Sequence, residues 1–360
     1  MIAKLQPNRV RRTYLGGGRI DAFTGARADV SDGVPRPEDW MASTVTAFNG
    51  TLEIKGEGLG RLEDGRLVKD MIGTLPILVK LLDSDERLVI QAHPTVPCAK
   101  RLFNSPVGKT ECWYFLPGTA PDACVYLGFK PDMTRTAWEE TVRAGVDDNR
   151  QTTDDNRTVE PSNCRSGRRS SNVERSSPAP LLSFLHRIPV AAGDFVFVDG
   201  GMPHAIGGGC FMIELQEPSD LMVVAERFTP SGRRIPDAKM HGGIGWEKMF
   251  DVYEYEGHTF DATCARYVRK CSQTSNVHKS SLNTNINVTQ IVGPELTDKF
   301  EMWRVTGGER VELPRKRSVA VVTDGVGEAN GLAVTKGDRL LIADERDIVV
   351  KGAATLVVCA

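Results

Sequence analysis

The chain of 360 residues lacks the features that mark several large classes of protein. It contains no Cys-x-x-Cys pair, and its eight cysteines are scattered along the chain. This pattern is typical of reduced thiols rather than of a disulfide framework. The sequence has no run of 18 apolar residues, so no transmembrane helix is expected. Residues 1–12 are basic and lack the apolar segment of a signal peptide, so we expect a soluble cytoplasmic protein.

A large net charge is also absent. The 45 lysines and arginines nearly balance the 47 aspartates and glutamates, which leaves a formal charge of -2. This balance gives no electrostatic reason to expect a nucleic acid or an anionic membrane as partner. Arg11, Arg12 and Arg19 fit either an anion site or scattered surface arginines. The oligomeric state stays open.

Short apolar segments separated by proline, glycine and aspartate turns predict a mainly β protein with a few helices. The strands expected in the first part of the chain cover residues 44–48, 52–54, 79–82, 88–92, 110–116, 123–129, 195–198 and 210–215. A short helix is expected over 136–144, and a second helical segment over 236–250. The strands expected near the end of the chain cover 300–305, 319–322, 331–334, 339–342 and 354–358.

The composition divides the chain into segments. Residues 147–180 are rich in Ser, Arg, Asn, Asp and Thr, and they predict a disordered insertion because they have little apolar surface to bury. Residues 1–146 and 181–235 are expected to form one domain, 236–285 a helical connection, and 286–360 a second β barrel. Gly193-Asp194 and Gly337-Asp338 each precede a strand, which indicates a weak internal repeat.

Polar side chains on two strand segments suggest a metal site. Residues two apart in a strand share one face, so Gln91 pairs with His93 and Lys109 with Glu111. His204 follows a second strand and a tight turn. Two imidazoles, a carboxylate and an amide oxygen suit zinc, or another divalent metal, with an open coordination position. Taken singly, each histidine fits an ordinary turn or core residue better than a metal ligand.

The spacing Gly193-x5-Asp199-x-Gly201-x2-His204 resembles the second motif of the cupin superfamily. Four ordered blocks narrow the resemblance: residues 78–83, 90–94, 108–114 and 203–209. Together they resemble the class I, zinc-dependent mannose-6-phosphate isomerase family. The resemblance implies a tandem cupin fold of two jelly-roll barrels, of which only the first binds metal. It also implies an enzyme that interconverts mannose 6-phosphate and fructose 6-phosphate through a cis-enediol.

The resemblance also assigns residues. It implies one zinc ion per chain, held by four ligands, which are Gln91, His93, Glu111 and His204. Lys109 and Glu214 are both candidates for the catalytic base. Lys80, Ser219 and Arg227 are candidates for binding the sugar or its phosphate, with Arg227 only a doubtful substitute for a family arginine.

This chain departs from the family pattern at three positions. Val224 stands four residues after Asp220, where the family has an arginine, and Val89 stands where a serine or threonine helps to hold phosphate. Thr95 replaces a usual aspartate. The first two changes leave two alternatives open. One is a catalytically silent cupin that binds metal and sugar as a regulator or sensor, and the other is an isomerase of an unphosphorylated sugar.

Overall fold

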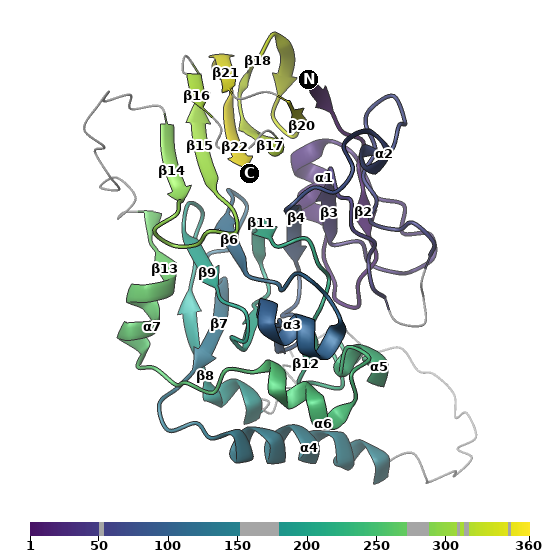
Figure 1. Cartoon of the computed structure of the whole chain (residues 1–360), viewed down its shortest axis with the longest axis vertical. Helices are drawn as coiled ribbons and strands as arrows, with labels where there is room; N and C mark the ends of the chain where they lie inside the picture. Colours follow the sequence, from purple (N-terminus) through teal and green to yellow (C-terminus); the bar gives the residue numbers. More distant parts are fainter. Residues whose placement is uncertain (50–53, 152–179, 272–287, 308–309, 313–316, 345–346) are drawn as a thin grey trace, which may run out of the picture.

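The computed structural model describes residues 1–49, 54–151, 180–271, 288–307, 310–312, 317–344 and 347–360. These residues form two antiparallel β-sandwiches that lie one beyond the other, with helices at the far end of the first (Figure 1). Among the described helices, none combines the length and the apolar character that spanning a bilayer requires.

The first sandwich pairs a seven-stranded sheet with a five-stranded sheet. The larger sheet has the order β13 (Val268–Arg269), β9 (Phe195–Val198), β6 (Glu111–Phe115), β11 (Cys210–Gln216), β4 (Leu78–Ser84), β3 (Glu38–Met41) and β2 (Arg9–Val10). The smaller sheet has the order β12 (Val223–Val224), β5 (Gln91–Ala92), β10 (His204–Ile206), β7 (Cys124–Phe129) and β8 (Leu185–Pro189). Side chains that point between these two sheets form the candidate site.

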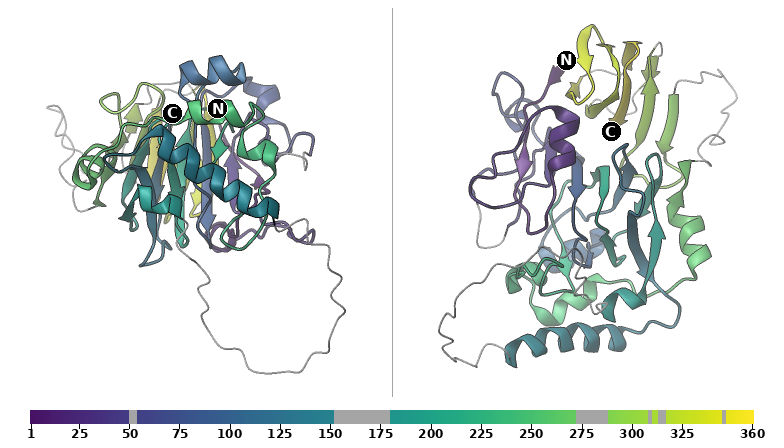
Figure 2. Two further views of the ribbon diagram at one scale, coloured as in Figure 1. Left: turned by 90° about the horizontal axis from the view of Figure 1, so that it is seen from below. Right: turned by 180° about the vertical axis from the view of Figure 1, so that it is seen from behind.

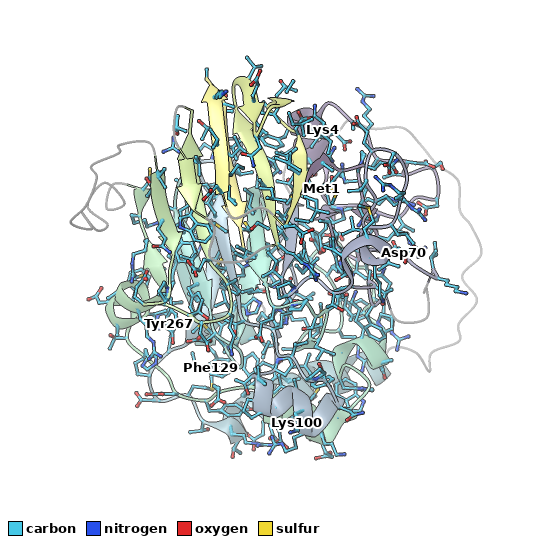
Figure 3. All side chains as sticks on the ribbon, turned by 45° about the horizontal axis from the view of Figure 1, so that its top comes forward. Met1, Lys4, Asp70, Lys100, Phe129 and Tyr267 are labelled. Atoms are coloured by element: carbon cyan, nitrogen blue, oxygen red, sulfur yellow. The ribbon has the colours of Figure 1, made fainter. Side chains whose placement is uncertain are left out.

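The second sandwich combines a six-stranded and a four-stranded sheet. The six strands are β1 (Ile2–Lys4), β20 (Arg339–Ala343), β17 (Arg317–Asp324), β22 (Thr355–Cys359), β15 (Met302–Thr306) and β14 (Val288–Val292). The four are β16 (Arg310–Glu312), β21 (Asp347–Gly352), β18 (Val326–Ala329) and β19 (Leu332–Thr335). Strand β1 pairs with β20, so the first residues of the chain join the second sandwich and not the domain in which they were predicted. Figure 3 shows Met1 and Lys4 beside the yellow C-terminal strands.

The helices lie mainly on the outside of the first sandwich (Figure 2). They are α1 (Gly18–Thr24), α2 (Val68–Ile72), α3 (Val96–Phe103), α4 (Arg135–Gln151), α5 (Asp237–Met240), α6 (Trp246–Met249) and α7 (Phe260–Tyr267), with short 3-10 turns at Pro180–Phe184 and Phe250–Val252. In α4, Trp138 and Val142 lie four residues apart and share one buried face. They pack with Phe129 and Leu185 of the smaller sheet, so α4 covers the outer face of that sheet.

Most predicted strands are confirmed within a few residues of their ends, but two predicted strands and both predicted helical segments differ. Residues 44–48 form no strand, because Thr44 Oγ1 accepts a hydrogen bond from Leu75 N and Ser43 Oγ bonds to Val45 N, which favours a turn. The strand predicted over 88–92 shortens to Gln91–Ala92. The helix predicted over 136–144 continues to Gln151, so residues 147–151 of the predicted disordered segment are helical. Residues 152–179, and residues 52–53 of another predicted strand, lie outside the described residues.

The helical segment predicted over 236–250 is two short helices rather than one. Gly242 and Gly243, with φ of 56° and 83°, separate α5 from α6. Positive φ values end a helix, and glycine adopts them without steric cost.

The two turns of the predicted repeat have the same geometry. Gly193 and Gly337 adopt φ of 86° and 91°, ahead of β9 and β20. In each turn the aspartate that follows the glycine accepts a hydrogen bond from the backbone three residues before it: Asp194 Oδ2 from Ala191 N at 3.0 Å, and Asp338 Oδ2 from Thr335 N at 2.8 Å. The second sandwich therefore repeats a turn of the first.

One apolar core continues from the first sandwich into the second. Phe300, which is fully buried, contacts Phe197 of β9 with ring centroids 6.4 Å apart. We expect Phe300→Ala to lower the free energy of unfolding by about 3–5 kcal/mol, the usual loss when a buried phenylalanine is truncated. Urea unfolding followed by tryptophan fluorescence measures this.

Phe228→Ala provides the control, because that ring is 37% exposed and its loss should change the free energy by no more than about 0.5 kcal/mol. A Phe300→Ala protein as stable as the wild type would mean that the two sandwiches do not depend on this contact.

Candidate metal and substrate site

Three buried residues from both sheets of the first sandwich come together as a group with metal-binding geometry. One ligand atom from each of His93, Glu111 and His204 lies within 4.8 Å of the others. His204 on β10 pairs directly with Gln91 on β5, and His93 follows β5, while Glu111 approaches from β6 of the opposite sheet. The structure therefore places these three predicted ligands together at the centre of the sandwich.

Backbone carbonyls orient both histidines. His93 Nδ1 lies 2.9 Å from Leu221 O, and His204 Nδ1 lies 2.9 Å from Met202 O. A carbonyl only accepts, so each Nδ1 carries the proton and each Nε2 keeps its lone pair. The Nε2 atoms of His93 and His204 lie 3.2 and 3.4 Å from Glu111 oxygens. Burial lowers the pKa of both rings, that of His204 to about 3, which keeps them neutral as metal ligands must be.

Glu111 has the character of a carboxylate that requires a cation. Both oxygens are buried, and neither accepts an aligned hydrogen bond. Burial alone would raise the pKa of Glu111, but the Lys109 and His93 charges outweigh it and hold that pKa well below its usual range. Lys109 Nζ lies 2.8 Å from both Glu111 Oε2 and His93 Nε2. The Lys109 ammonium thus occupies the position of a cation beside Glu111 and His93, and such a position fits a site for a divalent metal.

Gln91 supplies a fourth polar group at the same point. Its side-chain Nε2 lies 3.3 Å from His204 Nε2. A half-turn of the amide exchanges its nitrogen and oxygen, because the two ends have nearly the same shape. The amide oxygen can then face the metal position beside His204. The Gln91 amide thus lies next to the group of His93, Glu111 and His204.

Two loops that carry the histidines are held against each other. Gly201 N, before His204, donates to His93 O at 2.6 Å. A Cβ at Gly200 would lie 2.9 Å from Thr95 Cα, so only glycine allows the loops this close. Thr95, where the family has aspartate, accepts a hydrogen bond from Cys98 N and caps α3. Both residue types are good helix caps, so this departure does not disturb the site.

We call His93, Glu111 and His204 the metal group. A cavity beside it is lined by Gln91, Lys109, Glu214 and Lys80. Glu214 on β11 pairs with Lys80 on β4, and Lys80 Nζ lies 3.0 Å from Glu214 Oε2. Lys109 Nζ lies 3.9 Å from Glu214 Oε1. Burial raises the pKa of Glu214 to about 7, although the charge of Lys80 opposes it. Burial would lower the pKa of Lys80, but Glu214 and Glu38 outweigh it and raise that pKa.

A buried charge network forms a second wall of this cavity. Arg12 lies 2.9 Å from Glu38 Oε1 and 3.2 Å from Asp220, and its guanidinium stacks over the Trp40 ring at 5.0 Å. Tyr14 donates to the same Glu38 oxygen at 2.8 Å. Arg12 therefore lines the cavity with its charge already paired. Sequence reasoning left Arg12 ambiguous and missed Glu38 and Tyr14, because no local motif marks them.

Arg11 and Arg19, the other two arginines considered for an anion site, form ion pairs with acidic side chains outside the cavity. Arg11 pairs with Glu57 at 2.9 Å, and Arg19 pairs with Asp83 at 2.6 Å. Neither is among the residues that line the cavity.

Two predicted substrate-binding residues lie outside the cavity wall. Ser219 Oγ donates to Gly108 O at 2.7 Å, which ties its loop to the segment before Lys109. Arg227 forms an ion pair with Asp237 at 2.7 Å and lies over the Trp246 ring. Arg227 comes three residues after Val224, and an odd spacing along an extended chain reverses the face.

The positions of the missing family residues form an apolar patch. Val89 and Val224 belong to one buried cluster with Ile235 and Met240. Val89, Val224 and Ile235 line the cavity. One wall of the cavity is therefore apolar at the positions where the family pattern has a hydroxyl and an arginine.

Comparisons of the sequence with known proteins find relatives over part of the chain. No family model matches the chain. Over 145 residues, 40% of this chain, it is 31% identical to mannose-6-phosphate isomerase ManA of Bacillus subtilis strain 168. Over a match of the same length it is 28% identical to the mannose-6-phosphate isomerase of Streptococcus mutans. These matches cover 35% and 34% of the relatives, so the chain spans about a third of their length.

The likeness in fold extends over the whole chain. The crystal structure of mannose 6-phosphate isomerase from Bacillus subtilis has a TM-score of 0.67 at 17% identity, covering 100% of this chain and 99% of that one. A zinc-bound mannose 6-phosphate isomerase has a TM-score of 0.61 at 14% identity, covering 99% and 98%. The predicted mainly β, tandem cupin architecture is confirmed, and so is the resemblance to this family.

Proposed function

We propose that this chain, which has the fold of the mannose-6-phosphate isomerases, is a zinc-dependent aldose-ketose isomerase that interconverts mannose 6-phosphate and fructose 6-phosphate. The observation that carries the proposal is the buried group of His93, Glu111 and His204 beside a cavity that holds Lys109 and Glu214. The relatives' names and the zinc-bound neighbour support it.

The donor set supports zinc as the cofactor. His93, His204, Glu111 and Gln91 would hold the ion through two nitrogens and two oxygens. When bound, zinc supplies a Lewis acid that polarises the sugar carbonyl and stabilises negative charge on its oxygen. The bonds at Nδ1 already orient the rings of His93 and His204, but the Lys109 ammonium, 2.8 Å from His93 Nε2, would have to move for that ring to hold zinc.

The chain's own residues would then move the protons. In this reaction a base removes the C2 proton of the aldose and returns it to C1, and a second proton passes between the two sugar oxygens, so a cis-enediol forms and collapses. Glu214 lines the cavity and has a pKa raised to about 7, so it can both accept and release a proton near neutral pH. We assign it as the base.

Lys109 and Lys80 take supporting roles in this proposal. Lys109, between Glu111 and the cavity, is placed to donate a hydrogen bond to a sugar oxygen beside the metal. Lys80 contacts Glu214 and lies over the Trp40 ring at 5.1 Å, so it is held rigidly against the cavity and positions the base. Ser219 supports Lys109 through Gly108 rather than touching the sugar.

A second candidate function is favoured by Val89 and Val224. Their apolar surface replaces a hydroxyl and an arginine expected near the substrate, which fits an unphosphorylated sugar. A silent sugar-binding regulator shares the same observation. Both differ from the main proposal in one measurable respect, which is turnover of the phosphorylated sugar.

The test is an isomerase assay on the purified full chain loaded with zinc. We expect conversion of mannose 6-phosphate to fructose 6-phosphate, loss of the activity after chelation with EDTA, and recovery on addition of zinc. Faster turnover of mannose than of mannose 6-phosphate would establish the unphosphorylated substrate instead. No turnover of either sugar by protein that carries zinc would overturn the enzymatic proposal.

A further inference from the structure

Lys239, on α5, has no role in the mechanism above and no counterpart in the motifs. Only 5% of the residue is exposed. It lines the cavity beside the metal group. Among the residues that the structure describes, none makes a hydrogen bond or an ion pair with its ammonium group. An unpaired ammonium in a residue that is 95% buried is costly, so it points to a missing anion.

The other cations of the cavity already have carboxylate partners. Lys109 contacts Glu111 at 2.8 Å, Lys80 contacts Glu214 at 3.0 Å, and Arg12 contacts Glu38 at 2.9 Å. Among the described residues that line the cavity, Lys239 is the one cation that keeps all of its donors available. It is therefore the group in this cavity best able to bind an anion brought by a ligand.

Lys239 lines the cavity together with Arg12 and Asp220, and with Val89 and Val224 of the apolar wall. After burial, the charges that act most strongly on the pKa of Lys239 are those of Arg12 and Asp220. The lysine therefore shares the cavity with the wall that lacks the expected polar groups.

We propose that Lys239 binds the phosphate group of the substrate, and that it replaces in this chain the hydroxyl and the arginine absent at Val89 and Val224. A lysine ammonium is a compact cation that binds phosphate as a point charge. Burial lowers the pKa of Lys239 to about 8, so the side chain is still mainly protonated at neutral pH. A bound phosphate would stabilise the protonated form further.

This inference rests on the proposed function for its substrate, but it can be tested separately from it. The probe is inorganic phosphate, titrated calorimetrically into the zinc-loaded full chain. The variants are Lys239→Met, which keeps the length and removes the charge, and Lys239→Gln. The matched control is Lys248→Met, because Lys248 is exposed on the neighbouring helix α6.

In the wild type and Lys248→Met we expect phosphate to bind, and in both Lys239 variants to bind roughly 10- to 100-fold more weakly, the loss expected for one charge-assisted hydrogen bond. The KM for mannose 6-phosphate should rise by a similar factor with kcat within about threefold, because the lysine binds a part of the substrate that does not react. The KM for mannose should stay unchanged.

Phosphate affinity within twofold of the wild type in either folded Lys239 variant would overturn the inference. Thermal unfolding identifies which variants are folded, and one folded variant is sufficient. If the wild type turns over neither sugar, the proposed function fails, while the phosphate titration still decides the role of Lys239. If phosphate does not bind the wild type at all, the inference fails whatever the isomerase assay shows.

Discussion

Glu111→Gln should remove bound zinc and isomerase activity together. Glutamine keeps the size of the side chain but removes the only negative charge among the four proposed ligands. It also places N–H donors next to His93 and His204. The Nε2 atoms of these rings lie 3.2 and 3.4 Å from the carboxylate oxygens of Glu111. We expect zinc affinity to fall by more than the roughly 10–100-fold seen when only a group that orients a ligand is lost.

Metal analysis after dialysis and the isomerase assay measure the two effects. The control is Glu247→Gln, since that carboxylate is 86% exposed and lies on α6. Activity of Glu111→Gln should return partly, if at all, only at high added zinc. A variant that keeps one equivalent of zinc through dialysis would show that Glu111 is not a ligand.

Glu214→Gln should lower kcat by about 10²–10⁴-fold while leaving zinc bound, because the loss of a general base has this range of effect. Burial raises the pKa of Glu214 to about 7, so the base form is lost as the pH falls through that value. In the wild type, kcat/KM should therefore decrease about tenfold per pH unit on the acid side. A bound divalent cation favours the carboxylate and moves this midpoint below 7.

The matched comparison is Lys109→Met, which removes the other candidate base. If Glu214 is the base, the acid limb of the pH profile persists in Lys109→Met and disappears in Glu214→Gln. The assignment fails if Glu214→Gln keeps most of the wild-type rate while Lys109→Met loses it. Profiles of kcat/KM between pH 5.5 and 8.5, with metal content checked at each end, separate these cases.

The predictable part of the fold follows from local pattern. Strand β4 is buried at all seven positions and β6 at most of its positions, so both appear in the sequence as short apolar runs. One segment that differs from prediction is 44–48, where Thr44 accepts a hydrogen bond from Leu75 N, 31 residues away along the chain. Pairing of β1 with β20 joins residues more than 330 apart, and no local pattern reports such a partner.

The grouping of the proposed metal ligands could be predicted from the sequence, whereas the place of Lys239 in the cavity could not. Gln91 and His93, and likewise Lys109 and Glu111, are two residues apart at the ends of β5 and β6, so the alternation of an extended chain places each pair on one face. Lys239 sits in a four-residue helix with no motif around it. Arg227 lies three residues after Val224, so its side chain points to the opposite face of the extended chain. It therefore pairs with Asp237 and does not replace the family arginine in the cavity.

Local sequence pattern accounts for the β-rich class, for the alternation that groups the proposed ligands, and for the absence of polar groups at Val89 and Val224. The set of side chains that share a buried cavity follows from the folded chain, because burial and charge pairing depend on the neighbours that folding supplies. Folding paired Arg12 with Glu38 and Asp220, raised the pKa of Glu214 to about 7, and left the ammonium of Lys239 without a partner among the described residues. The proposed catalytic base and phosphate-binding residue both follow from that pairing.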